Sequence, residues 1–138
     1  MNKALLDTDI LSEILKAKNA SVVSTAVKYK ESFGQFTISV ITVMEIVKGL
    51  HKVGRADALK KFLGGLRGIE IVSFDEPCSI IAGRMFADLE KTGQPIGKAD
   101  PMIAAIAIQH DLTLITGNTA HYERLQKLGY SLKLDNWR

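Results

Sequence analysis

The chain has few of the residues that build disulfide frameworks and zinc sites. It contains one cysteine, Cys78, and three histidines, which excludes an internal disulfide, argues against a zinc site and fits a reducing compartment. No apolar run reaches the ~18 residues of a membrane span. The short apolar segment that follows Met1 also lacks the design of a signal peptide. We therefore expect a protein of the cytoplasm that has no membrane contact.

The bulk composition is that of an ordinary globular protein. Of the 138 residues, 46% are hydrophobic and 24% are charged, and this length favours a single domain covering residues 1–138. The net charge is +3 and the sequence pI is about 9.0, which permits binding to a polyanion without requiring it. The basic residues are scattered, and no block of like charges marks a disordered tail.

Short β-branched segments alternate with longer segments of helical periodicity along the whole chain. Strands are predicted at residues 4–7, 36–40, 69–74, 112–116 and 131–134. Amphipathic or apolar helices are predicted between them, and we expect Ser21 and Thr42 to cap two of these helices. Regular alternation of this kind predicts an α/β fold, a three-layer α/β/α sandwich around a central parallel sheet of about five strands.

Four polar residues are predicted at equivalent positions beside the strands. Asp7 ends the first strand, and Glu45 lies on the first turn of the helix after the second. Asp100 opens the helix before the fourth strand, and Asn118 lies just beyond that strand. Because ligands of open α/β sheets bind in the crevice at the carboxyl ends of the strands, we expect these side chains to share one crevice.

Carboxylates gathered in one crevice point to a bound cation. They repel each other, and keeping them ionised without a counter-charge is costly. Oxygen ligands suit Mg²⁺ or Mn²⁺, and such an ion can activate water and orient a phosphodiester. Taken singly, each acid has a structural alternative. Asp7 and Asp100 are at positions where Asp caps helices, and Glu45 has capping-box spacing from Thr42.

Four blocks of the sequence, in order, resemble PIN-domain ribonucleases. Residues 5–11 read LLDTDIL, similar to the family's LLDTNIL opening, and residues 38–50 read ISVITVMEIVKGL, similar to its second block. Residues 95–105, PIGKADPMIAA, and 114–124, LITGNTAHYER, resemble the third and fourth blocks. The resemblance spans almost the whole chain and is strongest to the VapC-type toxins of bacterial and archaeal toxin–antitoxin pairs.

The resemblance implies a Mg²⁺- or Mn²⁺-dependent endoribonuclease. Asp7, Glu45 and Asp100 fall on the family's acidic metal-binding positions, with one or two ions left open. Asn118 falls on the fourth position of the site, where many members carry Asp and others Asn. The resemblance also implies a homodimer, held inactive by a small antitoxin protein whose tail reaches the acidic pocket.

Two positions depart from the family pattern. Asp9 stands where the family usually carries Asn, and adds a charge near the site. Its role is left open between a contribution to the site and a solvated acid of the first helical turn. His121 replaces a common acid before the aromatic residue of the fourth block, and its role is also left open.

An acidic crevice alone would repel RNA, so basic residues must line the approach. Lys48 lies one helical turn beyond Glu45, Lys98 lies just before Asp100, and Arg124 follows Asn118 on a short helix. We expect these three to contact phosphates, and the alternative for each is a solvated surface charge. Phosphate contacts would make RNA binding weaken as salt rises.

Two other classes of function remain open. Asp7-Thr8-Asp9 after an apolar strand resembles the opening of aspartate-nucleophile phosphohydrolases of the haloacid dehalogenase type, in which the first Asp attacks phosphorus and the second is the acid/base. That pattern also wants a late pair of adjacent acids, whereas Asp100 stands alone. The other class is a non-catalytic PIN-like binding module, and the presence of Asp7, Glu45 and Asp100 argues against it.

Overall fold

A computed structural model describes all residues from 1 to 138, and its centre is a five-stranded sheet in the order β3-β2-β1-β4-β5. All neighbouring strands are parallel. The chain builds outward from β1 in one direction and then returns to add β4 on its other side. This reversal makes the β1/β4 boundary the switch point at which an open sheet leaves a crevice. The strands are β1 (Ala4–Leu6), β2 (Thr37–Ser39), β3 (Glu70–Val72), β4 (Thr113–Ile115) and β5 (Leu134–Asp135).

Seven α-helices connect and cover the strands. They are α1 (Thr8–Lys16), α2 (Ala20–Phe33), α3 (Val40–Lys52), α4 (Ala56–Gly65), α5 (Glu76–Lys91), α6 (Asp100–Gln109) and α7 (Thr119–Lys127). One 3₁₀ turn, Leu66–Gly68, leads from α4 towards β3. None of the helices combines the length and the apolar character that crossing a bilayer requires.

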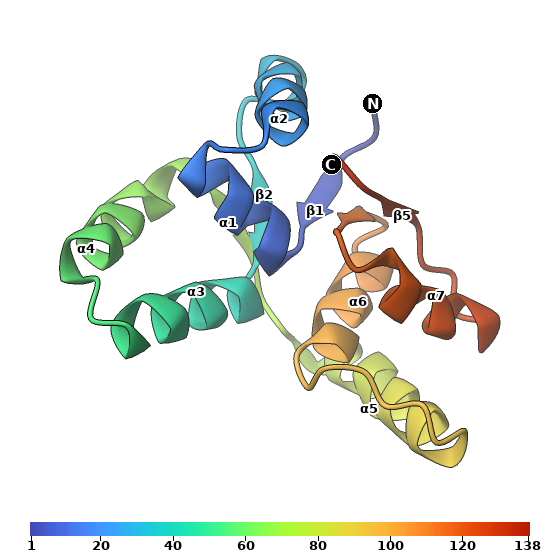
Figure 1. Ribbon diagram of the computed structural model, residues 1–138. Coiled ribbons are helices and arrows are strands. Elements are labelled where there is room, and N and C mark those ends of the chain that lie inside the picture. Colours follow the sequence, from blue (N-terminus) through green and yellow to red (C-terminus); the bar gives the residue numbers. More distant parts are fainter.

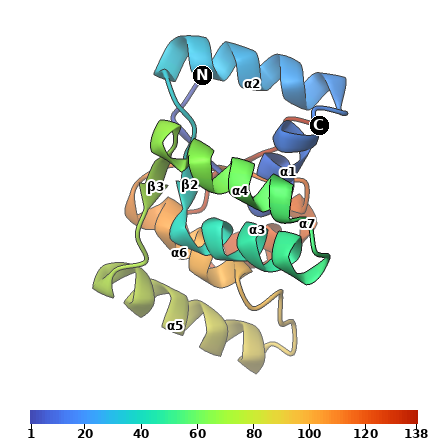
Figure 2. The ribbon, with the colours of Figure 1, turned by 90° about the vertical axis from the view of Figure 1, so that its left-hand side faces the viewer.

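Two hydrophobic cores lie on opposite faces of the sheet. Successive side chains of a strand point to opposite faces, so Leu6 packs with buried residues of α1 and α2, whereas Leu5 packs with those of α5, α6 and α7. Figure 1 shows α1 to α4 on one side of the sheet and α5 to α7 on the other, and Figure 2 shows α2 and α5 at opposite ends of the molecule. The predicted three-layer α/β/α sandwich is confirmed.

The last strand lies later in the chain than predicted. β5 covers Leu134–Asp135, whereas the sequence pattern predicted residues 131–134. Leu132 N donates to Tyr130 O at 2.9 Å, which keeps this part of the segment in a local turn. Pairing with β4 begins only where Leu114 N donates to Lys133 O at 2.8 Å.

Two predicted helix caps are wrong by two or three residues. Asn19, and not Ser21, caps α2 by accepting a hydrogen bond from Val22 N at 3.1 Å. Ser39, and not Thr42, caps α3 by accepting from Thr42 N at 3.0 Å. Several small polar residues compete for each cap, and the position at which the preceding segment ends decides between them. Because α3 begins at Val40, Glu45 lies beyond its first turn and is not part of a capping box.

Candidate active site

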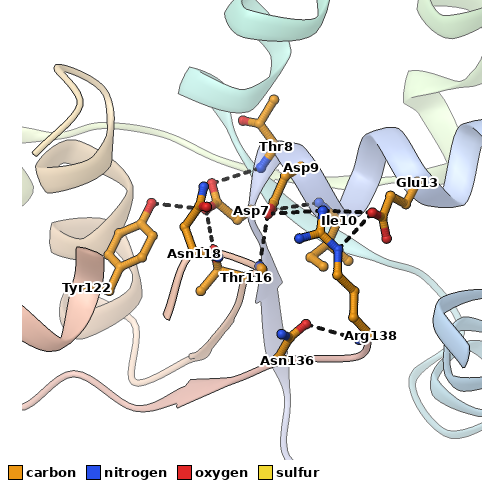
Figure 3. Close-up of polar contacts among 11 residues, drawn as sticks. Asp7, Thr8, Asp9, Ile10, Glu13, Thr116, Asn118, Tyr122, Asn136 and Arg138 are labelled. Carbon is orange, nitrogen blue, oxygen red and sulfur yellow. Dashed lines mark hydrogen bonds and ion pairs between the residues drawn. The ribbon is translucent and has the colours of Figure 1, made fainter. Parts of the chain in front are cut away.

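Asp7 lies at the switch point, directly after β1 and at the N-cap of α1. The residue is buried, with 4% of its surface exposed. Oδ1 accepts a hydrogen bond from Thr8 N at 2.8 Å, while Oδ2 accepts from Thr116 Oγ1 at 2.8 Å and from Tyr122 Oη at 3.1 Å. Figure 3 shows Thr8, Thr116 and Tyr122 approaching the carboxylate from different directions. A carboxylate held by three donors has a fixed orientation, as a metal ligand needs.

Thr8 brings Glu45 of α3 to the same place. Its hydroxyl donates to Glu45 Oε1 at 2.6 Å and lies 3.0 Å from the hydroxyl of the buried Thr42. Since Thr8 directly follows Asp7 in the chain, this bond joins the first turn of α1 to α3 beside the Asp7 carboxylate. Ser39, by contrast, serves as the cap of α3 and hydrogen-bonds to Thr42.

Asp100 approaches the crevice from the start of α6. Ala99 occupies the N-cap position and makes no side-chain bond to the helix, so the capping alternative for Asp100 is wrong. The Tyr122 hydroxyl, which donates to Asp7, lies close enough to Asp100 to oppose part of the rise in the pKa of Asp100. His121 Nδ1 lies 3.9 Å from Asp100 Oδ2. The predicted gathering of Asp7, Glu45 and Asp100 at one edge of the sheet is therefore present in the structure.

Two acids of the crevice have raised pKa values. Burial raises the pKa of Asp7 to about 7, and the neighbouring Asp9 carboxylate contributes to this rise. Burial also raises the pKa of Asp100, and Glu45 adds to this effect. Burial raises the pKa of Tyr122, so that its phenol stays a hydrogen-bond donor. Buried, mutually repelling carboxylates fit a site for a divalent cation with oxygen ligands.

The turn between β4 and α7 places Asn118 at the rim of this crevice. Asn118 N donates to Thr116 Oγ1 at 3.0 Å, and that hydroxyl in turn donates to Asp7. Asn118 is exposed, and its side chain makes no cap bond to α7. Its amide is therefore free to meet a ligand.

The three basic residues predicted to meet RNA lie on exposed or half-buried surface. Lys48 and Lys98 are exposed, on α3 and on the loop before α6. The Arg124 guanidinium on α7 donates from Nη1 to Pro95 O at 3.2 Å. None of these three makes an ion pair with an acid of the crevice. Their charges are thus available to a polyanion.

Two residues of the site were missed by sequence reasoning. Tyr122 was not among the predicted site residues, and Thr116 was predicted only as the end of a strand, yet both donate to Asp7 Oδ2. Helical spacing correctly predicts that Tyr122 is buried but cannot show where its hydroxyl points. A usable signal was its position four residues after Asn118, which places both on one face of α7.

A second cluster of metal-ligating side chains lies away from the crevice. Ligand atoms of Asp75, Cys78 and His110 lie within 4.8 Å of one another. Asp75 Oδ1 already accepts from Cys78 N at 3.1 Å as the cap of α5, and burial raises the pKa of the Cys78 thiol to about 11. We interpret this cluster as a helix cap. A hollow of about 430 Å³ between α2 and the segment after β5 contains none of the three acids of the crevice.

The sequence is similar to named ribonucleases over its full length. It is 30% identical over 138 residues to the tRNA(fMet)-specific endonuclease VapC of Shigella flexneri, covering 99% of both chains. It is also 30% identical over 131 residues to Ribonuclease VapC1 of Methanocaldococcus jannaschii, covering 95% of this chain and 87% of that relative.

A solved structure shares the architecture, and a family model spans the site. DNA-bound VapBC from Salmonella typhimurium superposes with a TM-score of 0.83 at 27% identity, covering 100% of both chains. The family model described as PIN domain matches residues 4–128, a range that includes Asp7, Glu45, Asp100 and Asn118. With these matches, the chain that brings three carboxylates to the β1/β4 switch point belongs to the PIN-domain family.

Proposed function

We propose that this chain is a Mg²⁺- or Mn²⁺-dependent endoribonuclease that hydrolyses RNA phosphodiester bonds. The observation that carries the proposal is the convergence of Asp7, Glu45 and Asp100 on one crevice of a PIN-domain chain. The names of its relatives, an endonuclease and a ribonuclease, support the reaction class. The likeness to VapBC supports a role as the toxin of a type II toxin–antitoxin pair.

Asp7 and Asp100 are the direct metal ligands in this proposal, with Glu45 as the third. When bound, the cation would stabilise negative charge on the phosphate and lower the pKa of a water molecule. Thr116 and Tyr122 keep Asp7 Oδ2 in a fixed orientation, and Thr8 does the same for Glu45 Oε1. Such supporting donors commonly determine how well a ligating carboxylate performs.

Asn118 and the basic surface residues would act on the RNA. The free amide of Asn118 can orient the scissile phosphate or the attacking water at the rim of the crevice. Lys48, Lys98 and Arg124 would contact phosphates on the approach. Single-stranded or structured RNA is the expected substrate, because unstacked bases can be splayed out and recognised.

A small antitoxin protein is the proposed partner, and a homodimer the proposed assembly. A basic side chain on the antitoxin's tail would enter the acidic crevice and take the place of the cation. A basic side chain would relieve the repulsion between buried carboxyl groups that raises the pKa values of Asp7 and Asp100. The single buried thiol of Cys78 fits the reducing cytoplasm, where we place this activity.

The aspartate-nucleophile alternative is not favoured. Its mechanism needs Asp9 as a free acid/base, yet Asp9 Oδ2 accepts from Gly117 N at 2.9 Å and faces the Arg138 guanidinium. Asp7, the nucleophile in that mechanism, has three hydrogen-bond donors on its two oxygens. Family membership also separates this chain from that class.

RNA cleavage should depend on a divalent metal and on the acids of the crevice. Purified protein is incubated with total RNA in Mg²⁺, in Mn²⁺ and in EDTA. Wild-type protein should cleave only with a metal, and Asp7→Asn and Asp100→Asn should each lower the rate by about 100-fold or more, because a ligand that stabilises transition-state charge is removed. The rates are measured by the decay of the full-length RNA.

Asp57→Asn is the matched control, because Asp57 is an exposed acid in the first turn of α4, outside the crevice. It should cleave at the wild-type rate. Cleavage by Asp7→Asn at the rate of Asp57→Asn would overturn the proposal. Hydrolysis of a small phosphate ester through a covalent aspartyl phosphate would support the aspartate-nucleophile class instead.

A further inference from the structure

The guanidinium of Arg138 reaches across the molecule to the first helix. Its Nε donates to Glu13 Oε1 at 2.7 Å, and its Nη2 lies 2.7 Å from the same oxygen and 3.6 Å from Asp9 Oδ2. Asp9 and Glu13 are one turn apart on α1, so one planar fork serves both acids. Figure 3 shows Arg138 extended from the segment after β5 towards these two side chains.

Gly117 gives the guanidinium the room that it needs. A Cβ atom at this position would overlap Nη1 of Arg138, and would lie 2.5 Å from its Cζ and 2.7 Å from Asp9 Oδ2. Only a residue without a side chain lets the guanidinium lie against the turn between β4 and α7. This turn is the one that carries Thr116 and Asn118, so Arg138 packs directly behind the rim of the crevice.

Both carboxylate oxygens of Asp9 already accept hydrogen bonds from the backbone. Its Oδ1 accepts from Ile10 N at 2.8 Å, and its Oδ2 accepts from Gly117 N at 2.9 Å while facing Arg138. The first bond belongs to α1 and the second ties α1 to the β4–α7 turn. An Asn could accept the same bond from Gly117, so the bond by itself does not need a charge. Asp adds a negative charge beside Asp7, and the guanidinium of Arg138, which it shares with Glu13, is the positive charge that faces it.

The backbone that carries Arg138 is held in place independently of the crevice. Trp137 is buried, its ring centroid lies 5.5 Å from that of Tyr29, and its carbonyl accepts from Ser21 Oγ at 2.7 Å. Arg138 N donates to Asn136 Oδ1 at 3.0 Å. The backbone from which the Arg138 side chain extends is therefore fixed beside α2.

We propose that Arg138 is a positioning residue that balances the charge of Asp9, keeps that carboxylate out of the metal-ligand set and holds the Gly117–Asn118 turn against α1. The inference rests on the proposed function, because it concerns a cation bound at Asp7 and Asp100. It assigns a role to Asp9, which supports the ligands without being one of them.

The test measures Mn²⁺ affinity by isothermal titration calorimetry, without RNA. Arg138→Ala should bind Mn²⁺ about fivefold more tightly than wild type, because one positive charge is removed near the site and Asp9 is released. The double variant Asp9→Asn/Arg138→Ala has the net charge of the wild type and should return to within about twofold of its affinity. Arg138→Lys keeps the charge and should also stay near the wild-type value.

Glu13 provides the matched control. It pairs with Arg138 more closely than Asp9 does, at 2.7 Å against 3.6 Å, but it makes no bond to the β4–α7 turn. Glu13→Gln/Arg138→Ala should therefore keep most of the tighter binding. RNA cleavage adds a second readout. The kcat of Arg138→Ala should fall about tenfold with little change in KM, because the support of Asn118 is loosened.

Equal Mn²⁺ affinities of wild type and a folded Arg138→Ala would overturn the inference. So would a double variant with Asn at position 9 that binds like Arg138→Ala, because the effect would then not pass through Asp9. If Arg138→Ala fails to fold, a shifted affinity in Arg138→Lys overturns the charge-balancing role. Wild-type protein that binds Mn²⁺ but does not cleave RNA would overturn the proposed function. The comparison of Mn²⁺ affinities would still decide the role of Arg138.

Discussion

At the scale of the residue, Asp7 performs two tasks with the two oxygens of one carboxylate. Oδ1 caps α1 through Thr8 N, whereas Oδ2 accepts from Thr116 and Tyr122 inside the crevice. The capping and metal-site interpretations of the sequence are therefore compatible, because opposite oxygens carry them. The cost of burying this acid is visible in its pKa, which burial raises to about 7.

The pH dependence of stability in EDTA should report this cost. The folded-state pKa of Asp7 is raised from 3.8 to about 7, so the folded protein holds a proton that the unfolded chain releases. The resulting stabilisation is full below about pH 4 and disappears as the pH rises to about 7, up to about 4 kcal/mol. Asp7→Asn should therefore raise the midpoint of thermal unfolding more at about pH 8 than at about pH 5.

The same two conditions applied to Asp57→Asn supply the comparison. Asp57 is exposed, and its replacement should shift the midpoint little at either pH. A shift for Asp7→Asn that does not depend on pH would contradict the buried, raised-pKa carboxyl. Differential scanning calorimetry or circular dichroism gives the midpoints.

At the scale of the element, two helices of the site, α1 and α3, are oriented by the residues that cap them. Asp7 caps α1 through Thr8 N, and Ser39 caps α3 by accepting a hydrogen bond from Thr42 N with its hydroxyl. Starting α3 at Val40 directs Glu45 towards Thr8 of α1. The residue at which α3 starts thus determines that Glu45 lies beside Thr8.

Ser39→Ala should show whether the orientation of α3 affects RNA cleavage beyond its effect on protein stability. Ser39 is fully buried, and removal of its cap bond should cost about 1 kcal/mol in the free energy of unfolding. Because α3 carries Glu45, cleavage of RNA should also slow. Asn19→Ala removes the cap of α2, which carries no site residue, and should reduce stability by a similar amount without slowing cleavage. Equal rates for the two variants would contradict this role of α3.

At the scale of the whole molecule, charge is arranged in two zones. The acids lie inside the crevice at the β1/β4 switch point, and Lys48, Lys98 and Arg124 lie on elements around it (Figure 2 shows α3, α6 and α7 on the same level). The net charge of +3 is small. Placement of these charges, and not their sum, would therefore guide a polyanion to the site.

RNA binding should weaken as salt rises, and this dependence should be carried by the basic residues of the site. In EDTA, which prevents cleavage, Lys48→Ala and Lys98→Ala should each make the slope of log affinity against log salt shallower by about 0.7, because each removes one charge that neutralises a phosphate. Lys28→Ala, on the exposed face of α2, should leave the slope unchanged. Fluorescence anisotropy of a labelled RNA gives the affinities. Identical slopes for all three variants would show that Lys48 and Lys98 do not contact RNA phosphates.

Local pattern in the sequence was enough to predict the layers and the three acids. Alternation of strands and helices predicts a covered parallel sheet, and parallel strands bring their carboxyl ends to one edge. Asp7 and Glu45 follow such ends, and Asp100 opens the helix that leads back into β4 and so begins at the same edge. Their meeting therefore follows without knowledge of the strand order. The expectation of a cation site is likewise a consequence of residue type and position.

Only the tertiary structure decided which partners complete the site. The order of the strands makes β1 central, and the competition between Ser39 and Thr42 for one cap depends on where β2 ends. Helical periodicity does not predict the direction in which the Tyr122 hydroxyl points. The pairing of Arg138 with Glu13 joins residues 125 positions apart, and long-range pairings of this kind depend on how the layers pack and not on local pattern.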